Sequence, residues 1–262
     1  MPPRDTVSTE PTEPAWSRDD LKGDPHASST KGDRVRRMFS SISHRYDLNN
    51  RVHSMGRDQA WRRRAVAMAT ITSTDDVVDV ACGTGDLTEA LADAGPASIC
   101  GIDFTPEMIE LAIAKATRRG DRHGLPTPTY TVGDAMAMDL SDESVDVVTI
   151  AFGLRNVQNP TDAIAEFARV LRPGGRLVVL EFSTPLNPLV RVGNHIYTHH
   201  IMPLTATLLS GDRSGAYRYL PRSIDTFARA EDVAALVRGG GLSEISQASL
   251  TLGVCTITVG IK

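Results

Sequence analysis

A glycine turn flanked by acids is the part of this sequence best suited to bind a small charged ligand. It reads Gly83-Thr84-Gly85, Asp86 follows it directly, and Asp103 closes the next apolar run. Glycine lets the backbone come close to a ligand, and the first N–H groups of a helix can donate hydrogen bonds to it. A carboxylate at the end of the neighbouring strand can accept hydrogen bonds from a ribose diol. The spacing therefore indicates a nucleotide site.

The residues around the turn favour one class of nucleotide. A dinucleotide fingerprint has a third glycine where this chain has Thr88, and that glycine lets the helix pack close to a pyrophosphate. Asp86 would repel a pyrophosphate, but it suits a ligand that carries an ammonium and a sulfonium. We therefore expect S-adenosylmethionine rather than NAD. An ordinary glycine turn of an α/β protein remains the alternative.

Strands and helices alternate along the chain around this turn. Short apolar runs predict strands at 77–80, 99–103, 129–132, 145–152, 176–182, 245–250 and 254–261, and helical patterns fall at 87–94, 106–120, 161–171 and 230–239. The run at 145–152 is almost wholly apolar and should be central. The alternation predicts an α/β fold in one domain, residues 33–262, with a doubly wound, mostly parallel sheet of seven strands and helices on both faces.

Three segments lie outside this alternation. Residues 1–32 are polar, with five prolines, and we expect a disordered tail. Residues 33–70 show apolar residues at helical spacing, which predicts either helices packed on the sheet or a helical lid over the cofactor. Residues 183–215 form a long helical insertion after a strand, placed to cover the crevice at the carboxyl ends of the strands.

Composition excludes several classes of protein. The net charge of −4 argues against a nucleic-acid-binding surface, so we expect no nucleic-acid partner. The three cysteines form no CxxC pair, which is typical of reduced thiols in a cytoplasmic protein and not of a disulfide or zinc framework. No apolar run approaches the roughly 20 residues of a membrane-spanning helix, and the first residues hold no apolar signal core.

Several stretches together resemble the menaquinone/ubiquinone biosynthesis C-methyltransferases, from about Val35 to Lys262. They are FSSISHRYDLNNRVHSMGRDQAWRR, VVDVACGTGDLT, FGLRNVQNPTDAIAEFARVLRPGGRLVVLEFSTP and YRYLPRSIDTF. The GTGD and PGGRL turns occur in many methyltransferases. The FGLRNV motif at 152–157, with RYDxxN before it and YRYLxxSI after it, is specific to this family.

The resemblance implies a class I methyltransferase fold with S-adenosylmethionine as cosubstrate. By position, Thr84 lines the cosubstrate between Gly83 and Gly85, Asp103 accepts from the ribose hydroxyls, and Asp134-Ala135 lie beside the adenine. Two positions depart from the family. Ala151 stands where some relatives have a serine that contacts the cosubstrate, and Thr258 stands where relatives carry a histidine.

The implied reaction is C-methylation of a polyprenylated quinol ring, with 2-demethylmenaquinol to menaquinol as the leading expectation. A cation beside the ring hydroxyl favours the nucleophilic phenolate, and Arg155 is the candidate. Asn156 could orient the quinol, and Tyr46 could reach the same hydroxyl or serve only in packing. Transfer from a sulfonium needs no metal, so we expect His195, His199 and His200 to be surface or helix-packing residues.

The expected partners follow from that substrate. An isoprenoid tail lives in the bilayer, so we expect transient docking at the inner face of the cytoplasmic membrane through the apolar run 201–209. The sequence leaves open a homo-oligomer, the tail length, a benzoquinol substrate and the identity of the base. Two rival readings are a methyltransferase of this fold acting on another phenol or lipid, and a binding module without turnover.

Overall fold

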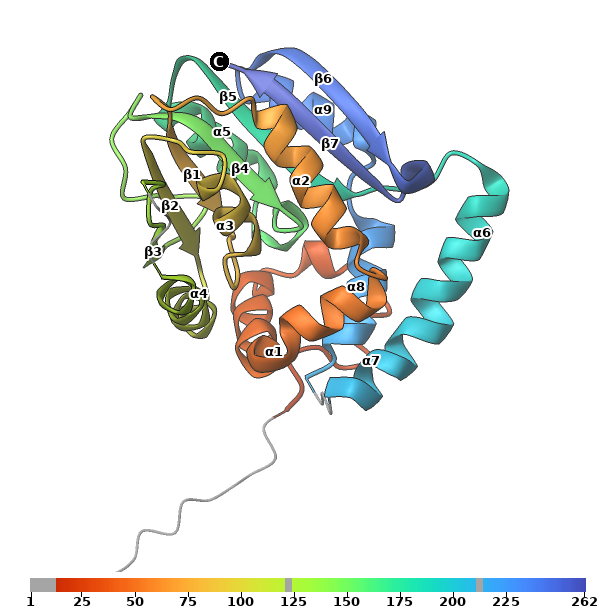
Figure 1. Cartoon of the computed structure of the whole chain (residues 1–262). Helices are drawn as coiled ribbons and strands as arrows, with labels where there is room; N and C mark the ends of the chain where they lie inside the picture. Colours follow the sequence, from red (N-terminus) through yellow and green to blue (C-terminus); the bar gives the residue numbers. More distant parts are fainter. Residues whose placement is uncertain (1–12, 121–123, 211–213) are drawn as a thin grey trace, which may run out of the picture.

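A single sheet organises the computed structural model, which describes residues 13–120, 124–210 and 214–262 (Figure 1). Its seven strands are β1 (Asp76–Val80), β2 (Ser98–Asp103), β3 (Thr129–Val132), β4 (Val145–Ala151), β5 (Leu171–Phe182), β6 (Ser243–Leu250) and β7 (Cys255–Ile261). They are ordered β3-β2-β1-β4-β5-β7-β6; β7 is antiparallel to both neighbours, and the other pairs are parallel. The predicted doubly wound, mostly parallel sheet is confirmed.

One strand begins earlier than the sequence pattern predicts. Strand β5 starts at Leu171 instead of Arg176, because the predicted turn at 173–175 is a bulge within the strand. Val145 pairs with Leu171 and Val147 pairs with Arg176, so four residues of β5 lie opposite one residue of β4. Gly174, with φ +78°, gives the bulge its left-handed backbone.

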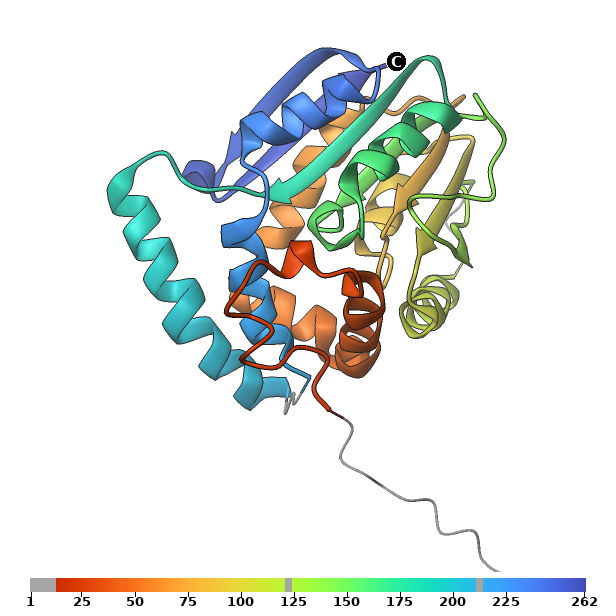
Figure 2. The same ribbon diagram turned by 180° about the vertical axis from the view of Figure 1, so that it is seen from behind.

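Helices cover both faces of the sheet. On one face α2 (Arg57–Ala69) and α3 (Asp86–Ala92) pack against the strands, and in the view from behind α5 (Pro160–Val170) and α9 (Ala230–Gly239) cover the other face (Figure 2). Helix α4 (Pro106–Arg119) connects β2 to β3. In β4, Val147, Val148 and Ile150 are fully buried, which confirms that this strand is central.

A group of helices gathers at the carboxyl ends of the parallel strands (Figures 1 and 2). It consists of α1 (Lys31–His53), α6 (Pro188–Ile196), the π-helical turn η3 (Tyr197–Ile201), α7 (Met202–Ser210) and α8 (Ala216–Thr226). The predicted lid at 33–70 is thus divided. Helix α2 buries Trp61, Ala65 and Ala69 in the core on the same face of the sheet as α3. Only α1 joins the helices at the carboxyl ends of the strands.

The structure differs from the expected disordered tail for residues 13–32. Trp16 is 1% exposed and stacks on Tyr219 of α8 at 4.7 Å between ring centroids, and its backbone N–H donates to the carbonyl of Ser214. A 3-10 turn, η1 (Pro25–Ala27), follows. One large aromatic side chain in a polar segment provides the buried area that orders it. Residues 1–12 lie outside the described residues.

Within the described ranges, no helix has the length and apolar content needed to span a membrane.

Candidate functional site

A cavity of about 280 Å³ opens at the carboxyl ends of the neighbouring strands β1 and β4, where the strand order reverses. The residues after the carboxyl ends of β1, β2 and β3 line it, among them Gly83, Asp103, Asp134 and Ala135. Ligands of doubly wound sheets bind in this crevice, because the helices that follow neighbouring strands leave in opposite directions here. Four of the six predicted cosubstrate residues therefore lie on one cavity.

The glycine turn is shaped by left-handed backbone and by a close neighbour. Gly83 and Gly85 have φ values of +57° and +82°. A Cβ on Gly85 would lie 2.6 Å from the hydroxyl of Tyr130, so only glycine fits there. Helix α3 begins directly after the turn, at Asp86. The strand, turn and helix predicted for this stretch are confirmed.

Asp103 ties the end of β2 to the glycine turn. It is 9% exposed, and its two oxygens accept from the backbone N–H groups of Gly83 and Thr105, both at 2.8 Å. Burial raises the pKa of the Asp103 carboxyl and outweighs these hydrogen bonds, which lower it. Each carboxylate oxygen has a second lone pair. Asp103 can thus hold the turn and still accept hydrogen bonds from a diol in the cavity.

Asp134 has a role in its own loop as well. Its side chain accepts from the N–H of Met136 at 2.9 Å, which is the behaviour of an ordinary turn aspartate. The same loop brings Ala135, 9% exposed, to the cavity wall. Asp134 can be a turn residue and also lie beside the adenine, because the turn that it stabilises fixes the loop that the adenine ring would contact.

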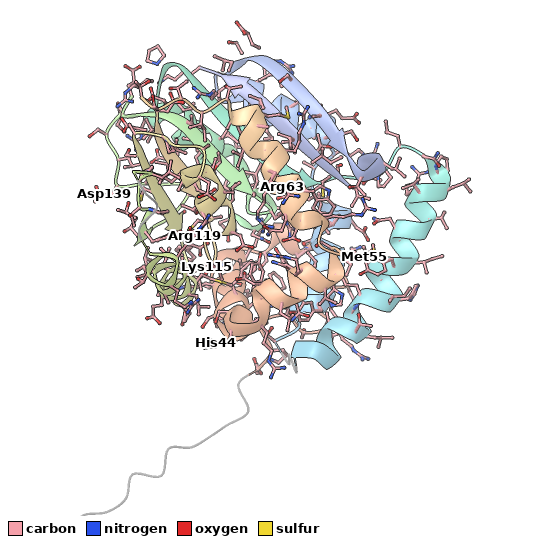
Figure 3. The ribbon with its side chains drawn as sticks, in the orientation of Figure 1. His44, Met55, Arg63, Lys115, Arg119 and Asp139 are labelled. Carbon is pink, nitrogen blue, oxygen red and sulfur yellow. The ribbon has the colours of Figure 1, made fainter. Side chains whose placement is uncertain are left out.

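Thr84 is placed differently from the other predicted residues. It is buried, and its hydroxyl donates to Asp47 of α1 at 2.5 Å, while Lys115 of α4 bonds both Asp47 and Asp86 at 2.8 and 2.6 Å. Lys115 is labelled beside α4 in Figure 3. Thr84 lines only a small neighbouring cavity of about 20 Å³. Its side chain thus anchors α1 to the glycine turn.

The same lysine weakens one argument made from the sequence. The burial of Asp86 acts to raise the pKa of its carboxyl, but the charge and hydrogen bond of Lys115 hold that pKa below its ordinary value. An aspartate neutralised by a lysine at 2.6 Å repels a pyrophosphate less than a free one would. The choice between nucleotide classes therefore depends on the missing third glycine at Thr88 more than on Asp86.

A second cavity, of about 150 Å³, adjoins the first. Phe39, Tyr46, Phe152 and Asn156 line both cavities, so they form the shared wall. The second cavity is mostly apolar, and its outer wall comes from α6, η3 and α8. The predicted helical insertion thus does cover the site, with α8 as a further wall that the element pattern did not include.

Arg155 lines the second cavity and is held by a buried acid. It is 5% exposed and donates to Glu181 of β5 at 2.6 Å and to the carbonyl of Phe152 at 2.7 Å. Among the described residues, its buried Nε–H has no acceptor. Sequence reasoning missed Glu181, although a lone acid in the apolar strand 176–182 was a visible signal.

Asn156 and Tyr46 complete the wall between the cavities. Asn156 donates to the carbonyl of Phe152 at 3.1 Å and accepts from the hydroxyl of Tyr219 at 3.0 Å, so its amide is fixed at both ends. Tyr219 belongs to the YRYL motif of α8, and this contact joins the two motifs that were specific to the family. Burial raises the pKa of the Tyr46 hydroxyl, which keeps it neutral and able to donate.

The fold defines the class of protein. A solved structure from Thermotoga maritima, described as a SAM-dependent methyltransferase, superposes with a TM-score of 0.62 at 18% identity, over 86% of this chain and 99% of that one. The sheet order, the helices on both faces and the glycine turn after β1 are those of the class I S-adenosylmethionine-dependent methyltransferase fold.

Sequence comparison then defines the family. A profile of the ubiE/COQ5 methyltransferase family matches residues 27–262, and the chain belongs to that family. A demethylmenaquinone methyltransferase of Deinococcus radiodurans is 42% identical over 233 residues, 88% of this chain and 94% of that protein. The ubiquinone/menaquinone biosynthesis C-methyltransferase UbiE of Citrifermentans bemidjiense is 41% identical over 239 residues, 90% of this chain and 100% of that protein. The resemblance inferred from the motifs is confirmed.

Proposed function

We propose that this protein transfers a methyl group from S-adenosylmethionine to a ring carbon of a polyprenylated quinol, converting 2-demethylmenaquinol to menaquinol. The observation that carries the proposal is the pair of cavities with a shared wall. The first cavity is lined by Gly83 of the glycine turn and by the buried carboxylate of Asp103. The second is mostly apolar and is lined by the buried Arg155. The names of the similar proteins from Deinococcus and Citrifermentans support the quinone substrate.

The residues on the first cavity fit the cosubstrate. Asp103 keeps acceptor capacity on both oxygens, and Gly83, which lines the cavity, lets the backbone of the turn come close to a ligand. Asp134 and Ala135 line the same cavity and would lie beside the adenine ring. S-adenosylmethionine supplies a methyl group that its sulfonium already makes electrophilic.

The protein's own contribution is then positioning and proton control. Alignment of donor and acceptor can lower a barrier by about 7–11 kcal/mol in favourable cases. The shared wall would hold the ring edge toward the first cavity. Arg155, which lines the second cavity, would hold its positive charge beside the ring oxygen and stabilise the phenolate, and Glu181 fixes the guanidinium for that purpose. Tyr46 and Asn156 would orient the ring hydroxyl.

A transfer assay tests the function directly. Purified protein should move tritium from methyl-labelled S-adenosylmethionine to a short-chain demethylmenaquinol, and the product should co-migrate with the menaquinol. Transfer to a simple phenol but not to the quinol would support the rival methyltransferase reading. Binding of both ligands without transfer would support the non-catalytic one. Either result contradicts the proposal.

Tyr219→Phe tests the support of Asn156. Loss of the hydroxyl removes the 3.0 Å hydrogen bond, so the amide becomes free to rotate away from the ring. We expect turnover to fall by about 10-fold, in line with a lost hydrogen bond of 1–1.5 kcal/mol. Affinity for S-adenosylmethionine, measured by calorimetry, should stay unchanged because Tyr219 does not line the first cavity. Equal losses in both measurements would indicate a general packing defect.

The affinity for S-adenosylmethionine should depend on the charge of Asp103. Because burial raises the pKa of this carboxyl and ribose hydroxyls would stabilise its ionised form, binding releases a proton at acidic pH. Affinity should therefore fall as the pH drops through that raised pKa. Burial also raises the pKa of Asp79 to about 6, and this carboxyl lies outside the first cavity. Calorimetry from pH 8 down to about pH 5 on wild type and Asp103→Asn separates the two. An unchanged pH dependence in the variant would remove Asp103 from the site.

The exposed apolar surface of the insertion extends beyond the run predicted to dock on the membrane. In the run 201–209, Ile201 and Leu204 are exposed, Met202 and Ala206 are buried, and side chains 207–209 lie outside those described. On α6, Leu189, Val192 and Ile196 are exposed at three- and four-residue spacing, so they share one face. The same helix contributes Asn194 to the second cavity. We propose that the exposed face of α6 meets the lipid where a tail would leave the cavity.

The double variant Leu189→Asp/Val192→Asp tests this contact. Charges on that face should lower binding to liposomes of anionic and neutral lipids by about 10-fold or more, since each lost apolar contact is worth 1.5–3 kcal/mol. Flotation measures it. Ile113→Asp is the matched control, because Ile113 is also an exposed apolar residue but lies on α4. Equal binding by wild type and double variant would contradict the contact.

A further inference from the structure

Three side chains that can ligate a metal meet at the rim of the helical insertion. They are His195 of α6, His199 of η3 and Asp225 of α8, and one ligand atom of each lies within 4.8 Å of the others. We propose that they bind a divalent metal ion of the zinc class, which fastens the insertion to α8. This site is separate from the methyl-transfer chemistry, and its test does not depend on the identity of the methyl acceptor.

The two ring nitrogens of His199 both lie close to oxygen atoms, in an arrangement that suits a metal ligand. Its Nδ1 lies 3.1 Å from the carbonyl of His195, and its Nε2 lies 2.8 Å from the Asp225 carboxylate. A neutral imidazole has one N–H, yet both nitrogens face oxygens that can only accept. The hydroxyl of Thr198 lies 3.1 Å from Nδ1 and 2.9 Å from the carbonyl of Asn194, and it has one proton to donate to either. For Nδ1 to donate to the His195 carbonyl while Nε2 contacts Asp225, the ring must be an imidazolium or bind a metal ion through Nε2.

A bound metal ion would account for both contacts of His199 with a neutral imidazole ring. Histidine ligands usually donate their second ring N–H to a backbone carbonyl, which fixes the tautomer and turns the other nitrogen to the metal. In this case Nδ1–H of His199 would donate to the His195 carbonyl, and Nε2 would bind the ion. Any proton on Nε2 in the metal-free protein would leave to solvent.

The second histidine is placed to share the ion. His195 precedes His199 by four residues on a continuous helical segment, and their rings stack with centroids 3.9 Å apart. A tetrahedral zinc ion with bonds of 2.0–2.1 Å spaces its ligand atoms by about 3.3 Å. Rotation of His195, which is exposed, can close the present spacing of up to 4.8 Å. Water would complete the coordination.

An ion at this location would connect two elements of the wall of the second cavity. It would join η3 to α8, and both contribute residues to the outer wall of the second cavity: Tyr197 and Thr198 from η3, Tyr219 and Leu220 from α8. His195 and Asp225 also line a further cavity, of about 340 Å³, together with Arg191 and Arg229, whose positive charges oppose a cation. We therefore expect a dissociation constant for Zn²⁺ of about 1–10 µM, well above that of closed four-ligand sites.

Calorimetric titration of the tag-free, chelator-treated full chain with Zn²⁺ tests the proposal. We expect one ion per chain, with affinity lowered by about 10-fold or more in each of His195→Gln and His199→Gln. His200→Gln is the matched control, because His200 is the exposed neighbour of His199 and lies outside the cluster. It should bind as wild type does.

Cobalt and thermal melting provide independent readouts. Co²⁺ at the site should give visible absorption of a four-coordinate ion in wild type and His200→Gln, and none in His199→Gln. Zn²⁺ should raise the melting temperature of the same two proteins only. Absence of binding below millimolar Zn²⁺ would overturn the proposal. So would equal binding by wild type and His199→Gln, which would place the ion on other groups such as the free cysteines.

Discussion

Arg155→Ala is expected to lower turnover by about 10²–10³-fold, the effect of removing one donor to a developing oxyanion. Affinity for S-adenosylmethionine should stay near that of wild type, because Arg155 lines the second cavity and not the first. Single-turnover transfer from the labelled cosubstrate measures the chemical step, and calorimetry measures binding. Lost cosubstrate affinity with unchanged chemistry would contradict the assignment.

The ion pair makes a second variant necessary. Removal of Arg155 alone leaves Glu181, 3% exposed, without its counter-charge, and breaking a buried pair in this way costs about 3–5 kcal/mol of stability. The double variant Arg155→Ala/Glu181→Gln removes both charges. We expect it to melt closer to wild type than Arg155→Ala does, yet to transfer methyl groups as slowly.

A matched arginine serves as the control for this series. Arg63 is exposed on α2, where Figure 3 labels it, and Arg63→Ala should leave both turnover and melting unchanged. If the double variant regained wild-type turnover, the slow chemistry of Arg155→Ala would come from instability, and Arg155 would have no part in the reaction.

Asp103→Ala should have the opposite effect to Arg155→Ala: it should lower the affinity for S-adenosylmethionine more than the rate of methyl transfer. Two charge-assisted hydrogen bonds from ribose hydroxyls, each worth 1.5–3 kcal/mol, would be lost, so affinity for S-adenosylmethionine should fall by about 10²-fold or more. At saturating cosubstrate most of the turnover should return. Calorimetry and the concentration dependence of the rate measure the two effects.

The structural cost of this variant has to be separated from its effect on binding. Without the carboxylate, the N–H groups of Gly83 and Thr105 lose their acceptor, and the turn loosens. Asp103→Asn retains the shape with one acceptor oxygen and should bind with intermediate affinity. Asp139→Ala is the control, since Asp139 is exposed and is labelled in Figure 3. Wild-type affinity in Asp103→Ala would remove this residue from the site.

The parts of the site that sequence could predict are those built from consecutive residues. Gly83, Gly85 and Asp103 follow neighbouring parallel strands, and strand ends at one edge of a sheet must meet. Local pattern therefore sufficed for the first cavity. Glu181 and Tyr219 were missed because their roles arise from contacts with Arg155 and Asn156 across 26 and 63 residues of chain.

Long-range packing also decided what the flanking segments do. The segment 13–32 reads as polar, and only the stacking of Trp16 on Tyr219, roughly two hundred residues away, orders it. Both helices of 33–70 carry apolar residues at helical spacing. Whether each covers the sheet or the cavity depends on which apolar surface remains unburied once the strands have paired.

The sequence by itself determined the class of this protein: a sheet of alternating strands and helices, a glycine turn that fits one backbone geometry, and motifs that place the chain in its family. These follow from local conformational preference and hydrophobic period, which act over a few residues. The tertiary structure alone decided the pairing of Arg155 with Glu181, the support of Asn156 by α8 and the meeting of two histidines with Asp225. Such contacts depend on the directions of side chains from distant elements, which only the packed fold fixes.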